Sequence, residues 1–441
     1  MSGAQKRAPQ RQVRGRAGGF SLIEMMIAIV LGILVAGALV SMFVGVRSAG
    51  RMTAGVGALT DSGRFALDTI QQAVRNAGNF ACDSTAPVTV AGYPVTRQLS
   101  LLNAGGSPLV SDFGEPIAGY EATGTGPGSA IVVSAAPAAG AMADNWATTA
   151  TLGGVLDAAL LAPPVPQGMA APVGSPIAGS DILVVHETPP GVTPAYTTTV
   201  ATGAGAFTIN SASTFSANAG QIGVISNCVQ MEVFQVATFT PGAGSGVVAL
   251  SGGAAAPGNN AGTFPSDPEF NIGSQVAPAD SIVFYIGVGE DGDGALFKFE
   301  TNGGVYGDGY SVNQELVPDV ENMQVLYGVE TAASATTQTV AQYVTADNVQ
   351  NVGNCNGDVV NGVIEAFNCV ISVKVALLIS SPPSAVQPAG AVNASTTTCD
   401  VLPPTAGQPP CLEDVSWQMT ATDSRVRKVF EQTMFLRDMS P

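Results

Sequence analysis

The sequence predicts an α+β protein in which one long N-terminal helix packs on an antiparallel β-sheet head. Three observations lead to this prediction. Residues 20–86 contain no proline, and apolar residues recur there at helical spacing. In the last third of the chain, apolar and polar residues alternate, as in strands with one buried face. Such a face needs a cover, and the apolar stripe of a helix supplies one.

The N-terminus divides into a basic leader and an apolar run. Residues 1–19 carry no acid and five basic side chains, which are Lys6, Arg7, Arg11, Arg14 and Arg16. Residues 20–46 carry a single charge, Glu24. At ~1.5 Å per residue this run is long enough to cross a bilayer as a helix. A secretory signal has small residues after its apolar core, whereas Gly19 comes before this one, so cleavage there would leave the core on the mature protein.

The helix is predicted to run over residues 20–78, with its second half packed on the head. Apolar and small residues in this half form one stripe, which consists of Val56, Leu59, Gly63, Ala66, Leu67, Ile70, Val74 and Ala77. Gly78 followed by Asn79 is the predicted stop, because glycine adopts the left-handed conformation that ends helices.

The head is predicted to comprise residues 79–441. Two stretches, 86–275 and 381–412, are rich in Gly, Ala, Ser, Thr and Pro and are expected to contain long loops. Strand-like islands within the first stretch are 130–134, 181–187, 223–226 and 228–236.

The last third predicts a more regular sheet. Residues 281–287 and 295–300 flank a turn-rich Glu-Asp-Gly-Asp-Gly string and predict a hairpin. Residues 322–330 and 371–379 alternate, and 425–437 predict a closing strand.

Composition excludes several classes of function. Between residues 98 and 424 the sequence has 27 acids and two bases, Lys298 and Lys374, so direct binding of nucleic acid is not expected. His186 is the single histidine, and the sequence contains no C-x-x-C, G-x-S-x-G, P-loop or H-E-x-x-H motif. We therefore expect no catalytic residues, no cofactor and no metal site. Calcium binding at 290–294 or 354–358 stays open as an alternative, although turn chemistry explains both strings.

Six cysteines suit an oxidising compartment: Cys82, Cys228, Cys355, Cys369, Cys399 and Cys411. Their spacing suggests two local loops, Cys355 with Cys369 and Cys399 with Cys411, which leaves Cys82 with Cys228. Since six cysteines allow fifteen pairings, this connectivity is one hypothesis among several.

The order of charge, glycine, Phe and Glu across residues 18–24 (Gly-Gly-Phe-Ser-Leu-Ile-Glu) resembles the class III signal of type IV prepilins and type II secretion pseudopilins. The resemblance implies cleavage between Gly19 and Phe20 by the prepilin peptidase, and methylation of the Phe20 amine. Glu24 then matches the family's glutamate at the fifth mature residue. A carboxylate within a membrane span costs roughly 2.5–3.5 kcal/mol at the helix centre. The resemblance gives Glu24 a compensating partner, the Phe20 amine of a neighbouring subunit, although an interfacial position without a partner is the alternative.

Several later strings resemble the PilW family of minor type IV pilins, and they occur in that family's order. Residues 75–82, 181–185, 284–297 and 427–438 are moderate matches, and residues 316–329 (Leu-Val-Pro-Asp-Val-Glu-Asn-Met-Gln-Val-Leu-Tyr-Gly-Val) are the strongest match. The resemblance implies a pilin-like fold and a non-enzymatic minor pilin that initiates assembly or sits at the pilus tip, in motility, adhesion or DNA uptake. A type II secretion pseudopilin and a pilus-associated adhesin are the alternatives.

The expected partners follow from this resemblance. They are the prepilin peptidase, other minor pilins, the major pilin and, before assembly, the inner membrane. Because basic loops stay cytoplasmic, residues 1–19 are expected inside and the head in the periplasm, later on the surface pilus.

Overall fold

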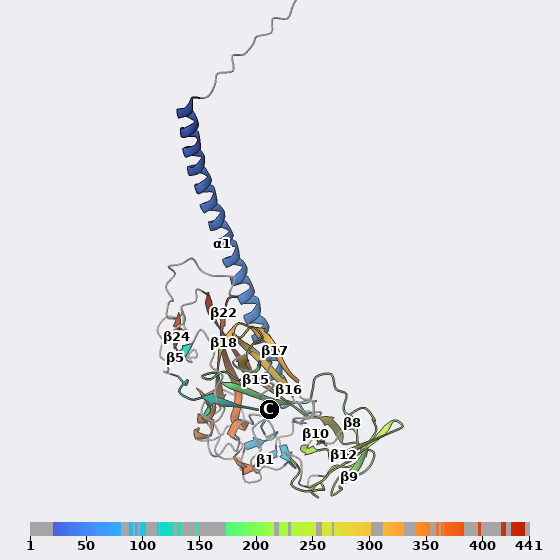
Figure 1. Ribbon diagram of the computed structural model, residues 1–441. Coiled ribbons are helices and arrows are strands. Elements are labelled where there is room, and N and C mark those ends of the chain that lie inside the picture. The colour runs from blue at the N-terminus through green and yellow to red at the C-terminus, as the bar shows by residue number, and fades with distance from the viewer. Residues whose placement is uncertain are drawn as a thin grey trace, which may run out of the picture.

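The structure is a computed structural model of the 441-residue chain. It describes residues 21–80, 88–90, 93–95, 98–102, 113, 115–127, 130–133, 146–147, 173–215, 220–227, 231–252, 258–266, 269–300, 312–329, 340–352, 359–360, 363–364, 366–382, 396–397, 416–419 and 425–436. Figure 1 shows a long helix whose first half projects from a β-rich head.

The predicted long helix is confirmed as α1 (Leu22–Asn76), which has 55 residues. It ends where the sequence indicated, since Gly78 has a φ of +77° and lies in the left-handed region. The Gly78 N–H donates to the His186 carbonyl oxygen at 2.9 Å, and the Thr188 N–H donates to the Asn79 carbonyl oxygen at 2.8 Å. These two bonds attach the end of the helix to the head.

Most of the predicted helix stripe is buried against the head. Its buried residues are Leu59, Gly63, Ala66, Leu67, Ile70, Val74 and Ala77. Val56 is an exception, because its side chain is exposed while the neighbouring Gly55 is buried. The covered part of the helix therefore begins near residue 59 for large side chains.

Two antiparallel sheets and the helix share the main core. The six-stranded sheet has the order β17 (Val312–Pro318), β16 (Gly294–Glu300), β15 (Asp280–Val288), β7 (Ile182–Glu187), β4 (Ile117–Ala122), β6 (Trp146–Ala147). The four-stranded sheet has the order β19 (Gln342–Val344), β18 (Val320–Val329), β22 (Val370–Ser380), β25 (Arg427–Phe435). Helix α1 contacts β25 and β22 of the second sheet and β17 and β7 of the first. The hairpin predicted around residues 290–294 is confirmed as β15–β16, and the predicted closing strand is β25, paired with β22.

The prediction of one buried face is wrong for the central strands β18 and β22. Nearly every residue of β18 and all of β22 are buried. Lys374 of β22 lies on the second face, where its Nζ is 2.9 Å from Glu431 Oε1 and 5.8 Å from the centre of the Tyr343 ring. An ion pair and a cation–π contact thus replace water on the second face.

A second unit, which we call the distal lobe, is inserted between the neighbouring strands β7 and β15 (residues 188–279). Four of its strands form a five-stranded sheet with β3 (Gln98–Ser100), which comes from outside the insertion, in the order β3, β11 (Met231–Gln235), β10 (Ile222–Ser226), β14 (Gln275–Pro278), β8 (Ala195–Tyr196). It also contains a three-stranded sheet with the order β12 (Thr238–Gly242), β13 (Ser245–Ala249), β9 (Ala206–Ile209). The lobe lies at the end of the molecule opposite to the start of α1 (Figure 1).

The distal lobe has its own aromatic core. Six phenylalanines pack in tilted and edge-to-face pairs with ring centres 5.3–6.3 Å apart: Phe207, Phe215, Phe234, Phe239, Phe264 and Phe270. The opposite face of the five-stranded sheet packs on Phe80 and Phe113, next to the end of α1. Residues 86–275 were expected to contain islands of strand among long loops. Two of these islands, 223–226 and 228–236, overlap β10 and β11 of this lobe, whereas 130–134 and 181–187 overlap β5 (Ala130–Val133) and β7 outside it.

The remaining elements are short. They are β1 (Val88–Val90) paired with β2 (Tyr93–Val95), β20 (Val359–Val360) paired with β21 (Val363–Ile364), β24 (Ser416–Met419) between β23 (Thr396–Thr397) and β5 (Ala130–Val133), and the 3₁₀ turns η2 (Ala346–Asn351) and η3 (Ala366–Cys369).

Gly63→Ala should weaken the contact between the helix and the head. A Cβ at Gly63 would lie 2.6 Å from Cγ of Phe430, a ring held by strand β25. Overpacking of this kind costs about 1–3 kcal/mol, so the thermal midpoint of the head in detergent should fall. Gly57→Ala is the matched control, because its Cβ would meet no atom within 4 Å. The control should be neutral or slightly stabilising, by up to about 1 kcal/mol; equal midpoints for the two variants would contradict the packing.

Candidate functional site

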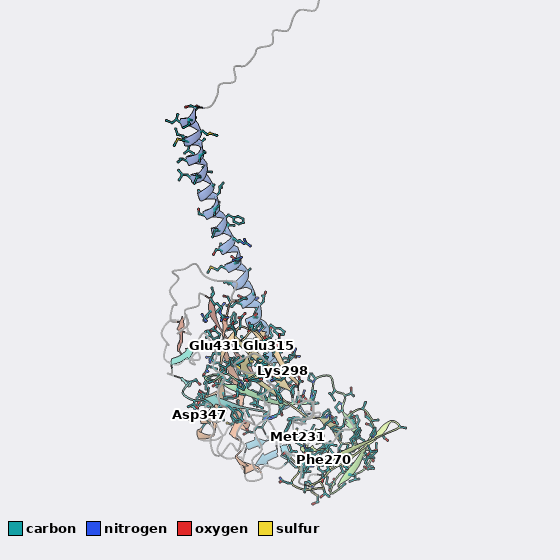
Figure 2. All side chains as sticks on the ribbon, viewed as in Figure 1. Met231, Phe270, Lys298, Glu315, Asp347 and Glu431 are labelled. Atoms are coloured by element: carbon teal, nitrogen blue, oxygen red, sulfur yellow. The ribbon has the colours of Figure 1, made fainter. Side chains whose placement is uncertain are left out.

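The first half of α1 is apolar and exposed on all sides (Figure 2). Its large exposed side chains are Leu22, Ile23, Met25, Met26, Ile27, Ile29, Val30, Leu31, Ile33, Leu34, Val35, Leu39, Val40, Met42, Phe43, Val44 and Val46. By length and composition this helix could cross a membrane, and the part of the head that the structure describes covers none of its most apolar segment. An apolar surface of this extent requires lipid or another protein to cover it.

Glu24 lies in the first turn of this helix, and its side chain is exposed. The Ser21 backbone N–H donates to Glu24 Oε2 at 3.1 Å. The carboxylate therefore satisfies one of the unpaired donors at the start of the helix, where the helix dipole also favours negative charge. Gly19 and Phe20, the predicted cleavage and methylation residues, lie outside the described residues.

A buried aspartate joins the two main sheets. Asp181 precedes β7, and its carboxylate accepts the Ala122 N–H of β4 and the Val325 N–H of β18, each at 2.8 Å. Burial raises the pKa of this carboxyl and of neighbouring Glu121, with Asp347 nearby adding negative charge. The Asp181 N–H also donates to the Met323 carbonyl oxygen at 2.9 Å. This junction holds β18, and so the four-stranded sheet, against the six-stranded one.

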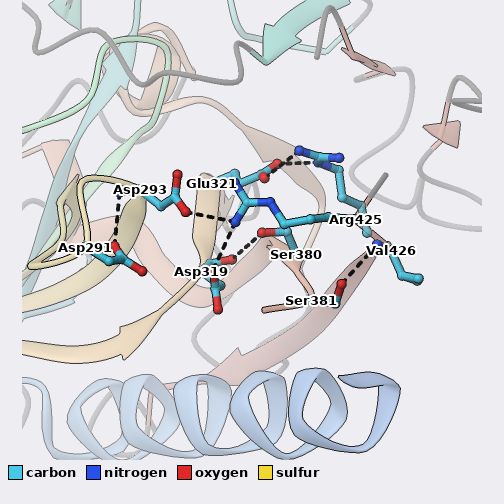
Figure 3. A network of polar contacts seen from close by, with 9 residues as sticks. Asp291, Asp293, Asp319, Glu321, Ser380, Ser381, Arg425 and Val426 are labelled. Carbon is cyan, nitrogen blue, oxygen red and sulfur yellow. Dashed lines mark hydrogen bonds and ion pairs between the residues drawn. The ribbon is translucent and has the colours of Figure 1, made fainter. Parts of the chain in front are cut away.

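A cluster of acids and arginines fixes the start of β25 (Figure 3). Arg425 Nη1 donates to Asp293 Oδ2 at 3.0 Å and to Asp319 Oδ1 at 3.1 Å. Arg427 forms a two-pronged pair with Glu321, with Nε–Oε2 and Nη2–Oε1 distances of 2.8 and 2.9 Å. The side chains of Arg427 and Glu321 retain only 4% and 9% of their surface to solvent, so removal of one would leave the other charge without compensation. The closing strand is therefore held by charge as well as by the sheet ladder.

The calcium alternative raised from residues 290–294 has a structural counterpart. Carboxylate oxygens of Asp291, Asp293 and Asp319 lie within 4.8 Å of one another. Arg425 already places its guanidinium between two of these carboxylates and supplies positive charge there. The other string, residues 354–358, lies outside the described residues.

Glu232 is a buried acid in the distal lobe. It faces the aromatic core from β11, across from Ile225 of β10, and its Oε2 has no hydrogen-bond partner among the described residues. Burial raises its pKa to about 7. No sequence pattern indicates this site, because Glu232 alternates with the apolar residues Met231 and Val233 and is therefore expected to face solvent.

Of the six cysteines, only Cys369 is among the described residues, and it is disulfide-bonded. Cys82, Cys228, Cys355, Cys399 and Cys411 lie outside them, so the connectivity stays a prediction.

The sequence does not predict the cluster of acids and arginines that holds β25, since Asp293, Asp319 and Arg425 are far apart along the chain.

Comparisons with known proteins give two family matches. Residues 14–40 match the prokaryotic N-terminal methylation motif, and residues 283–438 match the type IV pilus-assembly protein W family. A type IV-like pilin from Thermus thermophilus is 16% identical, with a TM-score of 0.20, over 51% of this chain and 86% of that one. A TM-score this low does not define a common fold. No curated protein sequence matches the chain at a significant level.

Glu232→Gln should make the stability of the head less dependent on pH. The folded-state pKa of Glu232, about 7, exceeds its usual value of 4.5, so the folded state retains a proton that the unfolded state loses. The contribution of Glu232 to the free energy of unfolding is fully present below about pH 4.5. It amounts to about 3 kcal/mol at most and is lost as the pH rises through 7. Between pH 5 and 8 the wild type should therefore lose more of its thermal midpoint than the variant. Glu290→Gln, at an exposed acid, is the control and should track the wild type; identical pH slopes for all three proteins would refute the burial argument.

Proposed function

Because this chain is a PilW-like type IV pilin, we propose that it acts as a minor pilin. In this role it is a non-enzymatic filament subunit of low abundance that helps to start assembly or occupies the tip of the pilus. The observation that carries the proposal is the exposed apolar half of α1, which bears one carboxylate in its first turn and is joined to a large head. Such a helix is stable in lipid before assembly and among other pilin helices after it.

Processing would create the partner that Glu24 needs. Cleavage between Gly19 and Phe20 places a new amine one residue before Ser21, whose N–H already bonds to Glu24 at 3.1 Å. A charged amine from a neighbouring subunit binds a carboxylate more strongly than a neutral N–H does, because charge-assisted hydrogen bonds are roughly twice as strong as neutral ones. Assembly would then exchange a capping bond within one helix for a charge pair between two helices, and this pair would set their axial register.

The position of the distal lobe supports a place at the tip. The start of α1 is expected in the membrane, and the lobe lies at the opposite end of the molecule (Figure 1). In a filament that grows from the membrane, the end of the subunit that carries the distal lobe would lie farthest from the membrane. A subunit at the tip has no subunit above its head, so an inserted lobe meets no steric obstacle there.

The match to a pilus-assembly family over residues 283–438 favours a pilus over a type II secretion system. The leader is proposed to stay cytoplasmic and the head to face the periplasm. The proposed partners are the prepilin peptidase, other minor pilins and the major pilin.

Deletion of the gene tests the minor role. Surface pili should fall sharply in number while the major pilin remains in the membrane, and gold-labelled antibody to the distal lobe should mark filament ends. Labelling along the whole filament shaft, or an unchanged number of pili, would contradict the proposal.

Glu24→Gln should be cleaved and methylated normally but enter filaments poorly. The amide oxygen of Gln can still accept the Ser21 N–H, so the variant keeps the cap and loses only the charge. Ser41→Ala, also in the exposed helix, is the matched control and should assemble like the wild type. Mass spectrometry of the membrane fraction checks cleavage before Phe20, and immunoblotting of sheared pili measures incorporation. Normal incorporation of Glu24→Gln would exclude the charge pair and leave capping as the role of Glu24.

A further inference from the structure

The distal lobe presents a sparsely charged surface on an acidic protein. The chain has a formal net charge of −17, yet residues 188–279 contain no basic side chain and three acids, Glu232, Asp267 and Glu269. Glu232 is buried against the aromatic core, whereas Glu269 is exposed. An anionic partner therefore finds no positive side chain to pair with in this part of the sequence.

One face of the lobe forms a regular array of side chains. Across the three-stranded sheet, Thr240 of β12 lies opposite Val247 of β13, and Val247 lies opposite Thr208 of β9. The chain at residues 196–200 extends this sheet beyond β9, because the Thr198 N–H donates to the Thr208 carbonyl oxygen at 2.7 Å. We call the outward side of these four segments the distal face, which consists of Tyr196, Thr198, Val200, Thr208, Thr240 and Val247.

The distal face is exposed and is supported from behind. Tyr196, Val200 and Val247 retain 44%, 49% and 41% of their surface to solvent. On the inward side of the same strands Phe207, Phe239 and Val248 are buried in the aromatic core. A sheet backed by interlocked rings holds its outward side chains at fixed spacing, with neighbouring strands ~4.8 Å apart.

The chemistry of this face selects its partner. Threonine hydroxyls donate and accept hydrogen bonds, valine offers apolar contact, and the Tyr196 ring can stack. Neutral polysaccharides present the complementary groups, which are hydroxyls at regular spacing and the C–H faces of sugar rings. An anionic surface would meet the negative potential of the remaining head and would gain no compensating ion pair on the distal face.

We propose that the distal face binds a flat, uncharged polysaccharide surface. The position of this face at the leading end of a tip pilin rests on the proposed function, whereas the binding itself does not. The surface interaction would bring the filament tip into contact with a neutral glycan without any ionic steering.

The test uses the full-length mature chain in detergent, so it does not depend on filaments. We expect retention on microcrystalline cellulose that persists at high salt, because no charge is involved, and little retention on alginate or on polystyrene beads. Val247→Lys and Thr240→Lys, both at exposed positions, should each lower retention by about tenfold, which corresponds to 1.4 kcal/mol. Gln342→Lys adds the same charge at an exposed residue of β19 and should leave retention unchanged.

Several results would overturn the proposal. These are an absence of retention on cellulose, retention that is lost in salt, equal retention on polystyrene, or unchanged retention by both lysine variants at wild-type thermal midpoints. Sedimentation that shows a dimer abolished by Val247→Lys would instead assign the face to a second copy of the chain. Loss of pili in the deletion strain bears on the proposed function alone, so the two proposals can fail separately.

Discussion

The packing of the first element of the chain on its last strand is the contact on which the rest of this structure depends. Gly63 of α1 meets Phe430 of β25, more than 360 residues later, and a Cβ at Gly63 would lie 2.6 Å from that ring. Loop closure over such a distance has a large entropic cost, which the shared core and the buried ion pairs at the start of β25 offset. Because this contact covers only the second half of α1, the first half is an apolar rod that no described residue of the head covers.

Buried charge in the head serves alignment more than net stability. Asp181 accepts an N–H from each of two strands in different sheets, and Arg427 pairs with Glu321 at the edge of β18. Burial of such groups costs desolvation energy, so apolar replacements would often be as stable. These groups instead fix how the strands align, because their hydrogen bonds form only when β4, β18 and β25 lie in one particular register.

The distal lobe is an insertion that leaves the main sheet intact. Strands β7 and β15 are neighbours in the sheet, with Asp280 opposite Glu187. The chain therefore leaves the sheet at the end of β7 and re-enters it directly alongside, at the start of β15. The family match begins at residue 283, just after the lobe. The match therefore covers part of the main head, residues 283–438, and none of the lobe.

The sequence alone determined the helix, its stop at Gly78 and the hairpin and closing strand of the last third, because these depend on local periodicity and turn chemistry. It also placed Glu24 in the first turn. It did not reveal the distal lobe, since Phe207, Phe234 and Phe264 are scattered among Gly- and Thr-rich segments that read as loops. It likewise missed the burial of Lys374 and Glu232, because alternation shows which residues share a face but not whether that face meets water. Tertiary structure decided those points, since burial depends on which distant segment covers a face, and only the folded chain brings these segments together.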